Sequence, residues 1–156
     1  MLKINIIAVG KNKETWVEEA INHYLKLLAR HASVSFIYIP DLKKSRELDN
    51  PELPRLEAPL IFKKIKSSCT VALVDKGKTY TSEEFAEYIS GLMMTSGGSV
   101  DFIIGGIHGL DKSILITCRE TLSLSPMTMS HQLIRPVLLE QLYRAFSILS
   151  GGKYHK

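Results

Sequence analysis

The chain has 156 residues, of which 45% are hydrophobic, so it is long enough to bury one core without help from metals or disulfides. Twenty lysines and arginines against 16 aspartates and glutamates give a formal net charge of +4. This excess is compatible with a polyanionic partner but too small to require one. We therefore expect a single domain over residues 1–156.

Cysteine usage and hydropathy indicate the compartment. Cys69 and Cys118 lie in apolar segments rather than in a Cys-X-X-Cys motif or a Cys/His cluster, which favours free thiols in a reducing compartment. The first ten residues are too short for a secretory signal, and no apolar run approaches the roughly 20 residues of a membrane span. The expectation is a cytoplasmic protein with no membrane partner.

The first third of the chain predicts alternating strands and helices. Residues 2–9 are rich in β-branched side chains and predict a buried strand, and apolar residues at helical spacing predict a helix over 14–31. A second strand is predicted over 33–39. The charged, turn-rich residues 41–53 are expected to form a mobile loop before a helix over about 54–67.

The same alternation continues in the middle of the chain. A strand over 69–75 is expected to end in a turn at Lys76-Gly77. The sequence TSEE at 81–84 is a capping box, because the threonine hydroxyl and the glutamate three residues later can each satisfy a free backbone N–H group. It predicts a helix that ends near Met94, followed by a strand over 99–106.

The last third predicts the remaining elements. A glycine-containing turn leads into a short helix with Asp111 as its N-cap. A short fifth strand is expected within ETLSLSPMTM, and the last helix is predicted from His131 to Leu149, with Ser130 as a candidate N-cap. Regular alternation without a repeat or linker predicts an α/β fold, with a mostly parallel central sheet and helices on both faces.

Motif spacing excludes several kinds of chemistry. Gly105, Gly106 and Gly109 form GGxxG rather than GxGxxG, and their simplest interpretation is a turn that needs positive φ. Gly10-Lys11 lacks the earlier glycine of a phosphate-binding loop. The five histidines show no HxxxH or HExxH spacing, and no serine lies in a GxSxG motif. We therefore expect no metal site, no nucleotide triphosphate hydrolysis and no covalent hydrolysis.

The last predicted helix is apolar around much of its circumference, more than one amphipathic stripe requires. Its apolar residues are Val137, Leu138, Leu139, Leu142, Ala145, Phe146 and Ile148. A helix with two surfaces to bury indicates self-association. Glu140 and Arg144 are four residues apart, and the sequence leaves open whether they form an ion pair or serve a function. Residues 154–156, taken alone, are most simply a frayed end.

Five segments resemble a known family. They are LVDKGK at 73–78, FIIGG at 102–106, LSLSPMTMSHQLIR at 122–135, EQLYRAFSIL at 140–149 and the terminal YHK. Together they resemble the RlmH (YbeA) family of ribosomal RNA methyltransferases, in the SPOUT class, over the whole chain. The resemblance implies a C-terminal trefoil knot, a topology that general rules on chain connections would exclude.

The resemblance also implies a function. Members of this family are homodimers that use S-adenosylmethionine to methylate N3 of a pseudouridine in helix 69 of 23S rRNA, within the assembled 70S ribosome. The residues implied to contact the cofactor are Leu73, Gly105, Leu124, Ser125, Pro126, Met127, Thr128 and Met129. The expectation for 105 is that glycine lets the backbone approach the cofactor closely.

Methyl transfer from a sulfonium needs proximity, orientation and loss of the N3 proton. The candidate catalytic residues are Arg144, His131, Tyr154 and His155, and the candidate RNA contacts are Arg135 and Lys156, with a structural role for Arg135 as the alternative. Two other functions remain open. One is a non-catalytic ribosome-binding protein on the same scaffold; the other is a flavodoxin-like or dinucleotide oxidoreductase, for which no phosphate-binding loop is found.

Overall fold

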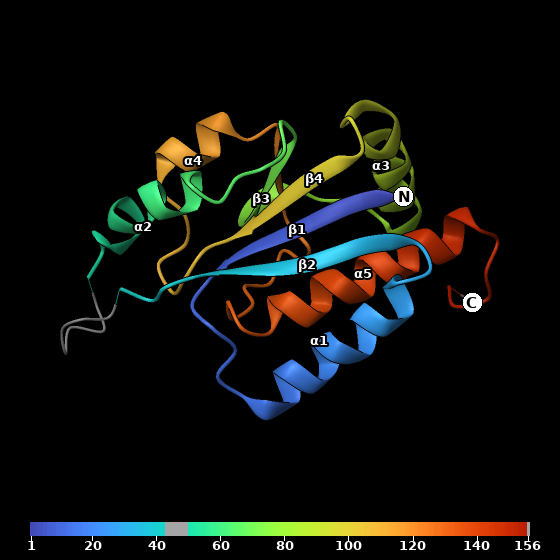
Figure 1. The fold of residues 1–156 in the computed structure, drawn as a ribbon, viewed down its shortest axis with the longest axis horizontal. Helices are drawn as coiled ribbons and strands as arrows, with labels where there is room; N and C mark the ends of the chain where they lie inside the picture. Colours follow the sequence, from blue (N-terminus) through green and yellow to red (C-terminus); the bar gives the residue numbers. More distant parts are fainter. Residues whose placement is uncertain (43–49, 156) are drawn as a thin grey trace.

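A sheet of five parallel strands forms the centre of the computed structural model, which describes residues 1–42 and 50–155 (Figure 1). The strand order is β2-β1-β4-β3-β5, and all pairings among these strands are parallel. The strands are β1 (Leu2–Val9), β2 (Ala32–Ile39), β3 (Thr70–Lys78), β4 (Ser99–Ile104) and β5 (Glu120–Leu122). The predicted fold class is confirmed, and the carboxyl ends of the strands share one edge.

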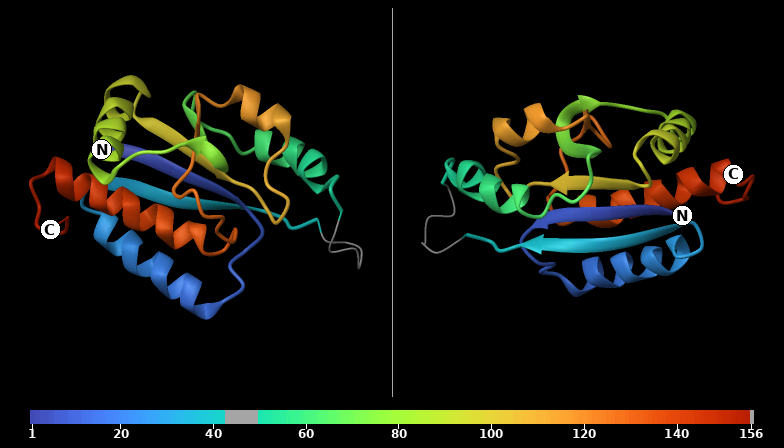
Figure 2. Two further views of the ribbon diagram at one scale, coloured as in Figure 1. Left: turned by 180° about the vertical axis from the view of Figure 1, so that it is seen from behind. Right: turned by 45° about the horizontal axis from the view of Figure 1, so that its top comes forward.

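Helices cover both faces of the sheet (Figure 2). The first, third and fifth helices pack on one face, and the second and fourth pack on the other. Their bounds are α1 (Thr15–Leu28), α2 (Leu53–Phe62), α3 (Ser82–Thr95), α4 (Lys112–Thr117) and α5 (Ile134–Leu149). None of the described helices is long and apolar enough to cross a membrane.

The central strands are buried on both sides. On β1, Ile4 and Ile6 join the core shared with α1, α3 and α5, whereas Ile7 and Val9 face α2 and α4. Strand β4 divides its side chains in the same way, with Phe102 on the first side. Such double burial accounts for the nearly continuous apolar runs in these two segments of sequence.

A buried carboxylate fixes the start of the central strand. Asp101 on β4 is fully buried and accepts hydrogen bonds from the Asn5 side-chain amide at 2.6 Å and from the backbone amides of Lys66 and Ser67 at 2.6 and 2.9 Å. Buried carboxylates are tolerated when their oxygens accept such bonds. The chain between α2 and β3 is therefore tied to the middle of the sheet.

The third and fifth strands end at different residues from those predicted. The turn expected at Lys76-Gly77 is wrong, because β3 continues to Lys78 with an irregular register against Leu122. A Cβ on Gly77 would lie 2.6 Å from the Leu122 carbonyl carbon, so glycine serves close strand approach there. The fifth strand ends at Leu122, which places SLSPM at 123–127 in a loop.

Helix ends were predicted with mixed success. The Thr81–Glu84 capping box and the Asp111 cap are both confirmed. The last helix begins at Ile134, three residues later than expected, while Ser130 Oγ accepts from the Leu133 amide at 3.1 Å and caps the turn before it. The first two helices end earlier than predicted, at 28 and 62. Residues 43–49 of the expected mobile loop lie outside the described residues.

The apolar circumference of α5 is buried within the same chain. This helix lies between α1 and α3 against the sheet, and Leu138, Leu139, Leu142, Ala145 and Phe146 are all buried there (Figure 1). The two helices and the sheet together cover the apolar sides of α5 that would face solvent in a surface helix. The breadth of apolar sequence is therefore explained by packing within the monomer and does not by itself indicate self-association.

Removing the buried carboxylate should destabilise the fold strongly. Asp101→Ala leaves one buried donor, the Ser67 amide, and two partly buried donors without their acceptor. Each lost acceptor costs about 1–3 kcal/mol, so we expect a loss of about 3 kcal/mol or more in the free energy of unfolding. Urea denaturation followed by circular dichroism measures it. Ser35→Ala is the matched control, because its hydroxyl donates to Asn5 from an exposed position. A loss below about 1 kcal/mol for Asp101→Ala would contradict this account.

Candidate active site

A pocket of about 450 Å³ lies at the carboxyl edge of the sheet, beyond the end of β4 and beside β3. Parallel sheets bind ligands at this edge, and the volume lies in the range of small-molecule sites. Three stretches of chain form its walls: part of β3, the loop after β4, and the residues that lead into α5. The lining residues include Leu73, Asp75, Gly105, Thr128, Met129 and His131.

The glycine-rich turn after β4 forms one wall of the pocket. Gly106 and Gly109 pair as an antiparallel bridge, with the Gly109 amide donating to the Gly106 carbonyl at 3.1 Å. Gly109 has a φ of +76°, and a Cβ on Gly105 would lie 2.5 Å from the Gly109 carbonyl oxygen. Positive φ and close backbone approach each require glycine, which explains the GGxxG spacing.

Half of the residues expected to contact the cofactor line this pocket. Leu73, Gly105, Thr128 and Met129 come together here, although they are up to 56 positions apart in the sequence. Leu124 lies instead in a neighbouring hollow beside α3 and packs against the core of that face. Of the predicted cofactor residues in the stretch 124–129, only the last two therefore form part of the pocket wall.

The loop that enters the pocket is held by one hydrogen bond within the loop and one to β3. The Met127 amide donates to Ser125 Oγ at 3.0 Å, and the Thr128 hydroxyl donates to Asp75 Oδ2 at 3.2 Å. Pro126 is exposed, and Met127 is 76% exposed. Contact of residues 125–127 with a cofactor stays a prediction.

Arg135 lies in the interior of the protein. It is fully buried and donates to the Val9 carbonyl at 2.7 Å, to Asn12 Oδ1 at 2.9 Å and to the His131 carbonyl at 3.0 Å. Burial lowers the pKa of its guanidinium. The expectation of an RNA contact is corrected here: the side chain reaches no surface, and the structural alternative holds.

Three of the four candidate catalytic residues, Arg144, Tyr154 and His155, lie together away from the pocket, near the C-terminal end of α5. Arg144 Nη2 bonds Glu140 Oε1 at 2.5 Å, so the ion pair that the sequence left open is present, and this bond raises the pKa of the arginine. The Tyr154 hydroxyl donates to the same carboxylate at 3.2 Å, and its ring lies 4.8 Å from the Arg144 guanidinium. His155 Nε2 lies 2.8 Å from Glu83 Oε1. Tyr154 and His155 are thus docked on α5 and α3 rather than frayed.

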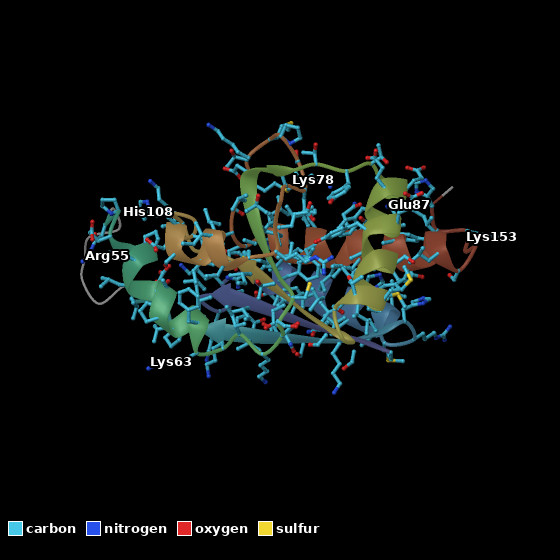
Figure 3. All side chains as sticks on the ribbon, turned by 90° about the horizontal axis from the view of Figure 1, so that it is seen from above. Arg55, Lys63, Lys78, Glu87, His108 and Lys153 are labelled. Atoms are coloured by element: carbon cyan, nitrogen blue, oxygen red, sulfur yellow. The ribbon has the colours of Figure 1, made fainter. Side chains whose placement is uncertain are left out.

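Helix α5 separates this cluster from the pocket. His131 and Ile134 line the pocket, but Arg144 follows ten residues later, about 15 Å along the helix axis at 1.5 Å per residue. His108 at the pocket end and Lys153 in the tail lie at opposite ends of the molecule in Figure 3. One chain therefore does not bring its four candidate catalytic residues together.

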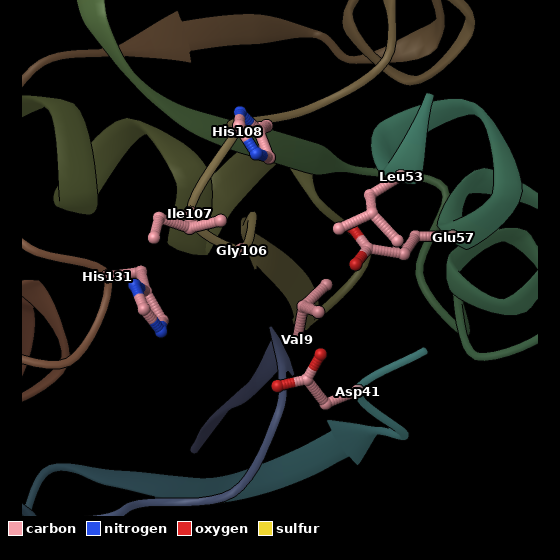
Figure 4. Close-up of a pocket in the computed structure, with 8 residues that line it drawn as sticks. All are labelled: Val9, Asp41, Leu53, Glu57, Gly106, Ile107, His108 and His131. Atoms are coloured by element: carbon pink, nitrogen blue, oxygen red, sulfur yellow. The ribbon is translucent and has the colours of Figure 1, made fainter. Parts of the chain in front are cut away.

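The structure adds one residue that the sequence reading missed. Glu57 on α2 is 4% exposed and lines a small cavity beside His131 (Figure 4). Burial raises its pKa from an ordinary 4.5 to about 7, with a further contribution from the charge of Asp41. The sequence pattern could have indicated this residue. Glu57 lies four residues from both Leu53 and Ile61, so it falls on the buried face of α2, where an apolar side chain is usual.

Lys156 lies outside the described residues. Within 1–42 and 50–155, no group of three or more histidine, cysteine, aspartate or glutamate side chains is arranged to hold a metal ion. The pocket presents apolar side chains, main-chain groups and the polar side chains of Asp75, Thr128, Ser130 and His131 to a ligand.

Comparison with solved structures supports the same architecture. A probable methyltransferase from Bordetella pertussis Tohama I aligns with a TM-score of 0.58 at 14% identity, covering 93% of this chain and 96% of that one. A probable methylase family protein from Haemophilus influenzae Rd KW20 aligns with a TM-score of 0.55 at 11% identity, covering 95% and 66%. At these identities the likeness concerns the fold alone.

Sequence comparison gives the family. Ribosomal RNA large subunit methyltransferase H of Clostridium botulinum (strain Kyoto / Type A2) is 41% identical over 159 aligned positions, covering 99% of this chain and all of the relative. The protein of that name from Acetivibrio thermocellus is 38% identical with the same coverage. The family model described as "Predicted SPOUT methyltransferase" matches residues 2–155. The chain belongs to the SPOUT methyltransferase family, among relatives named ribosomal RNA large subunit methyltransferase H.

Proposed function

We propose that this protein is an S-adenosylmethionine-dependent methyltransferase of 23S rRNA. The observation that carries the proposal is the pocket between the glycine turn after β4 and residues 128–131, in a chain whose full-length relatives are named for ribosomal RNA methylation. The proposed target is N3 of a pseudouridine in helix 69, in the assembled 70S ribosome. The trefoil knot and a cytoplasmic location belong to the same proposal.

The pocket suits the proposed cofactor chemically. Leu73, Ile104 and Ile134 offer apolar contacts for an adenine ring, and the turn at Gly105-Gly106 brings main-chain polar groups to the pocket wall. The Asp75 carboxylate, already accepting from Thr128, can accept further hydrogen bonds from a ligand. Bound here, S-adenosylmethionine would supply an electrophilic methyl group. The residues around it would hold it and exclude water.

The separation along α5 supports a homodimer. Arg144, Tyr154 and His155 of one chain lie too far from the pocket of that chain to act there. If they act in methyl transfer, a second chain must present them. We infer a composite site, with the cofactor pocket and His131 from one chain and the tail cluster from the other. In a two-fold dimer each chain would complete the site of its partner.

The activity is tested with labelled methyl groups. S-adenosylmethionine carrying the label is incubated with intact 70S ribosomes, free 23S rRNA, and 70S ribosomes that lack pseudouridine in helix 69. We expect label only on the intact ribosome, because the proposed target is a pseudouridine in the assembled particle. Equal label on all three would refute the proposed target. No transfer and no cofactor binding would favour a non-catalytic ribosome-binding protein.

The composite site is tested by complementation between two impaired chains. A chain lacking residues 154–156 and a His131→Ala chain are each expected to lose about 100-fold or more in kcat while still binding the cofactor. Differently tagged and co-expressed, the two should regain about a quarter of the wild-type activity, because half of the dimers are mixed and each mixed dimer has one intact site.

Tandem purification isolates the mixed dimers, whose activity should be about half that of the wild type, because one of their two sites is intact. If the tail acted on the pocket of its own chain, neither chain of a mixed dimer would be intact, and no activity would return. Full activity of the truncated chain alone would show that the tail has no role in methyl transfer.

A further inference from the structure

Glu57 differs from the other buried charged side chains. Asp101 accepts three hydrogen bonds and Arg135 donates three. Glu57 is 4% exposed, against 0% for those two residues, and no hydrogen bond or ion pair joins its carboxyl group to another described residue. A buried ionisable group without a partner is costly for the fold, so its position needs an explanation other than stability.

The carboxyl group points into a small cavity. Figure 4 shows it reaching from α2 toward Gly106 and Val9, at the carboxyl ends of β4 and β1. A Cβ on Gly106 would lie 3.6 Å from Glu57 Oε1. The cavity measures about 10 Å³, close to the least space that holds one water molecule. It is far too small for a nucleobase.

The cavity adjoins the proposed cofactor pocket. Gly106, Ile107 and His131 belong to the walls of both. Glu57 therefore lies one residue layer behind the pocket in which methyl transfer is proposed to occur. A group at this place can exchange a proton with a substrate at the pocket through a single water, which is within the reach of a general base.

We propose that Glu57 is the proton acceptor of the methyl transfer, taking the N3 proton of the target base through one water held in this cavity. The inference rests on the proposed function. The N3–H bond breaks, the water receives that proton and passes another to the Glu57 carboxylate, and the N3 electron pair forms the new bond to the methyl carbon. The bond from that carbon to the sulfur of the sulfonium donor breaks, with its electrons staying on sulfur.

The surroundings of Glu57 suit this task. Burial, with the charge of Asp41 second, raises the pKa of Glu57 to about 7, and a base works best when its pKa lies near the working pH. Three titratable groups from other segments face the same cavity: Asp41 after β2, His108 after β4 and His131 before α5. The experiments must therefore distinguish the titration of Glu57 from the titration of each of these groups.

The first test is the rate with intact ribosomes at saturating cofactor. Wild-type kcat should rise with pH to a plateau above about pH 7, as Glu57 loses its proton. Glu57→Gln should lower kcat about 100-fold or more with an unchanged Kd for S-adenosylmethionine. The matched control is Glu52→Gln, which makes the same chemical change at an exposed position just before α2 and should keep the wild-type rate.

A second variant assigns the titration to Glu57. Asp41→Asn removes a like charge, which lowers the pKa of Glu57 and should move the midpoint of the pH profile to lower pH without abolishing the plateau. His108→Asn and His131→Asn should each retain a rising limb, although the second should be slower. A midpoint that stays fixed in Asp41→Asn but vanishes in His131→Asn would assign the base to His131 and overturn the proposal.

Thermal unfolding gives a readout that needs no activity. Because the folded pKa of Glu57 is raised from 4.5 to about 7, its stabilising contribution is full below pH 4.5 and is lost as pH rises through 7. Glutamine does not titrate. The Tm of Glu57→Gln relative to wild type should therefore be several degrees higher at pH 8 than at pH 5. A constant difference would show that Glu57 has an ordinary pKa and is no base.

The outcomes separate this inference from the proposed function. If wild-type protein methylates ribosomes and Glu57→Gln retains at least half of the rate, the proposed function stands and the role of Glu57 is wrong. If wild-type protein transfers no methyl group to any substrate, the proposed function itself fails.

Discussion

One buried guanidinium joins the segments on which the site depends. Arg135 donates to the end of β1, to the loop that follows it and to the turn before α5, so residues more than 120 positions apart meet at a single side chain. An unpaired buried charge would be very costly, but here three hydrogen bonds satisfy it, and the Tyr38 ring lies 5.8 Å from the guanidinium. The hydrogen bond from Arg135 to the His131 carbonyl holds His131 in place. His131 in turn forms part of the wall of both cavities.

The fold was largely predictable because its main signals are local. Runs such as LKINIIAV and SVDFII have the composition of strands buried on both faces, and the capping residues at 81 and 111 satisfy helix ends within a few positions. The errors arose where distant contacts decide. Gly77 looks like a turn residue until the backbone of Leu122 is placed against it, and the apolar circumference of α5 looks like an interface until α1 and α3 surround it.

The site was predictable in part, for the same reason. Leu73, Gly105, Thr128 and Met129 were found through the resemblance of whole motifs, and their convergence follows from the shared edge of parallel strands. Glu57 belonged to no motif, and its raised pKa comes from burial that only the packed structure reveals. Arg135 was predicted to contact RNA because it is a basic residue in a largely polar motif. In the structure it is buried, and its guanidinium N–H groups donate hydrogen bonds inside the protein.

The place of α5 between α1 and α3 also bears on how the chain folds during synthesis. The last helix fills the centre of one helical layer, and β1 pairs with β4 almost 100 residues later. Chains fold as domains while they are made, from the N-terminus onward. Here the apolar sides of α1 and α3 stay uncovered until α5 has been synthesised, so the N-terminal part cannot complete its native core before then. The apolar sides of the two earlier helices therefore stay open to non-native contacts until α5 covers them.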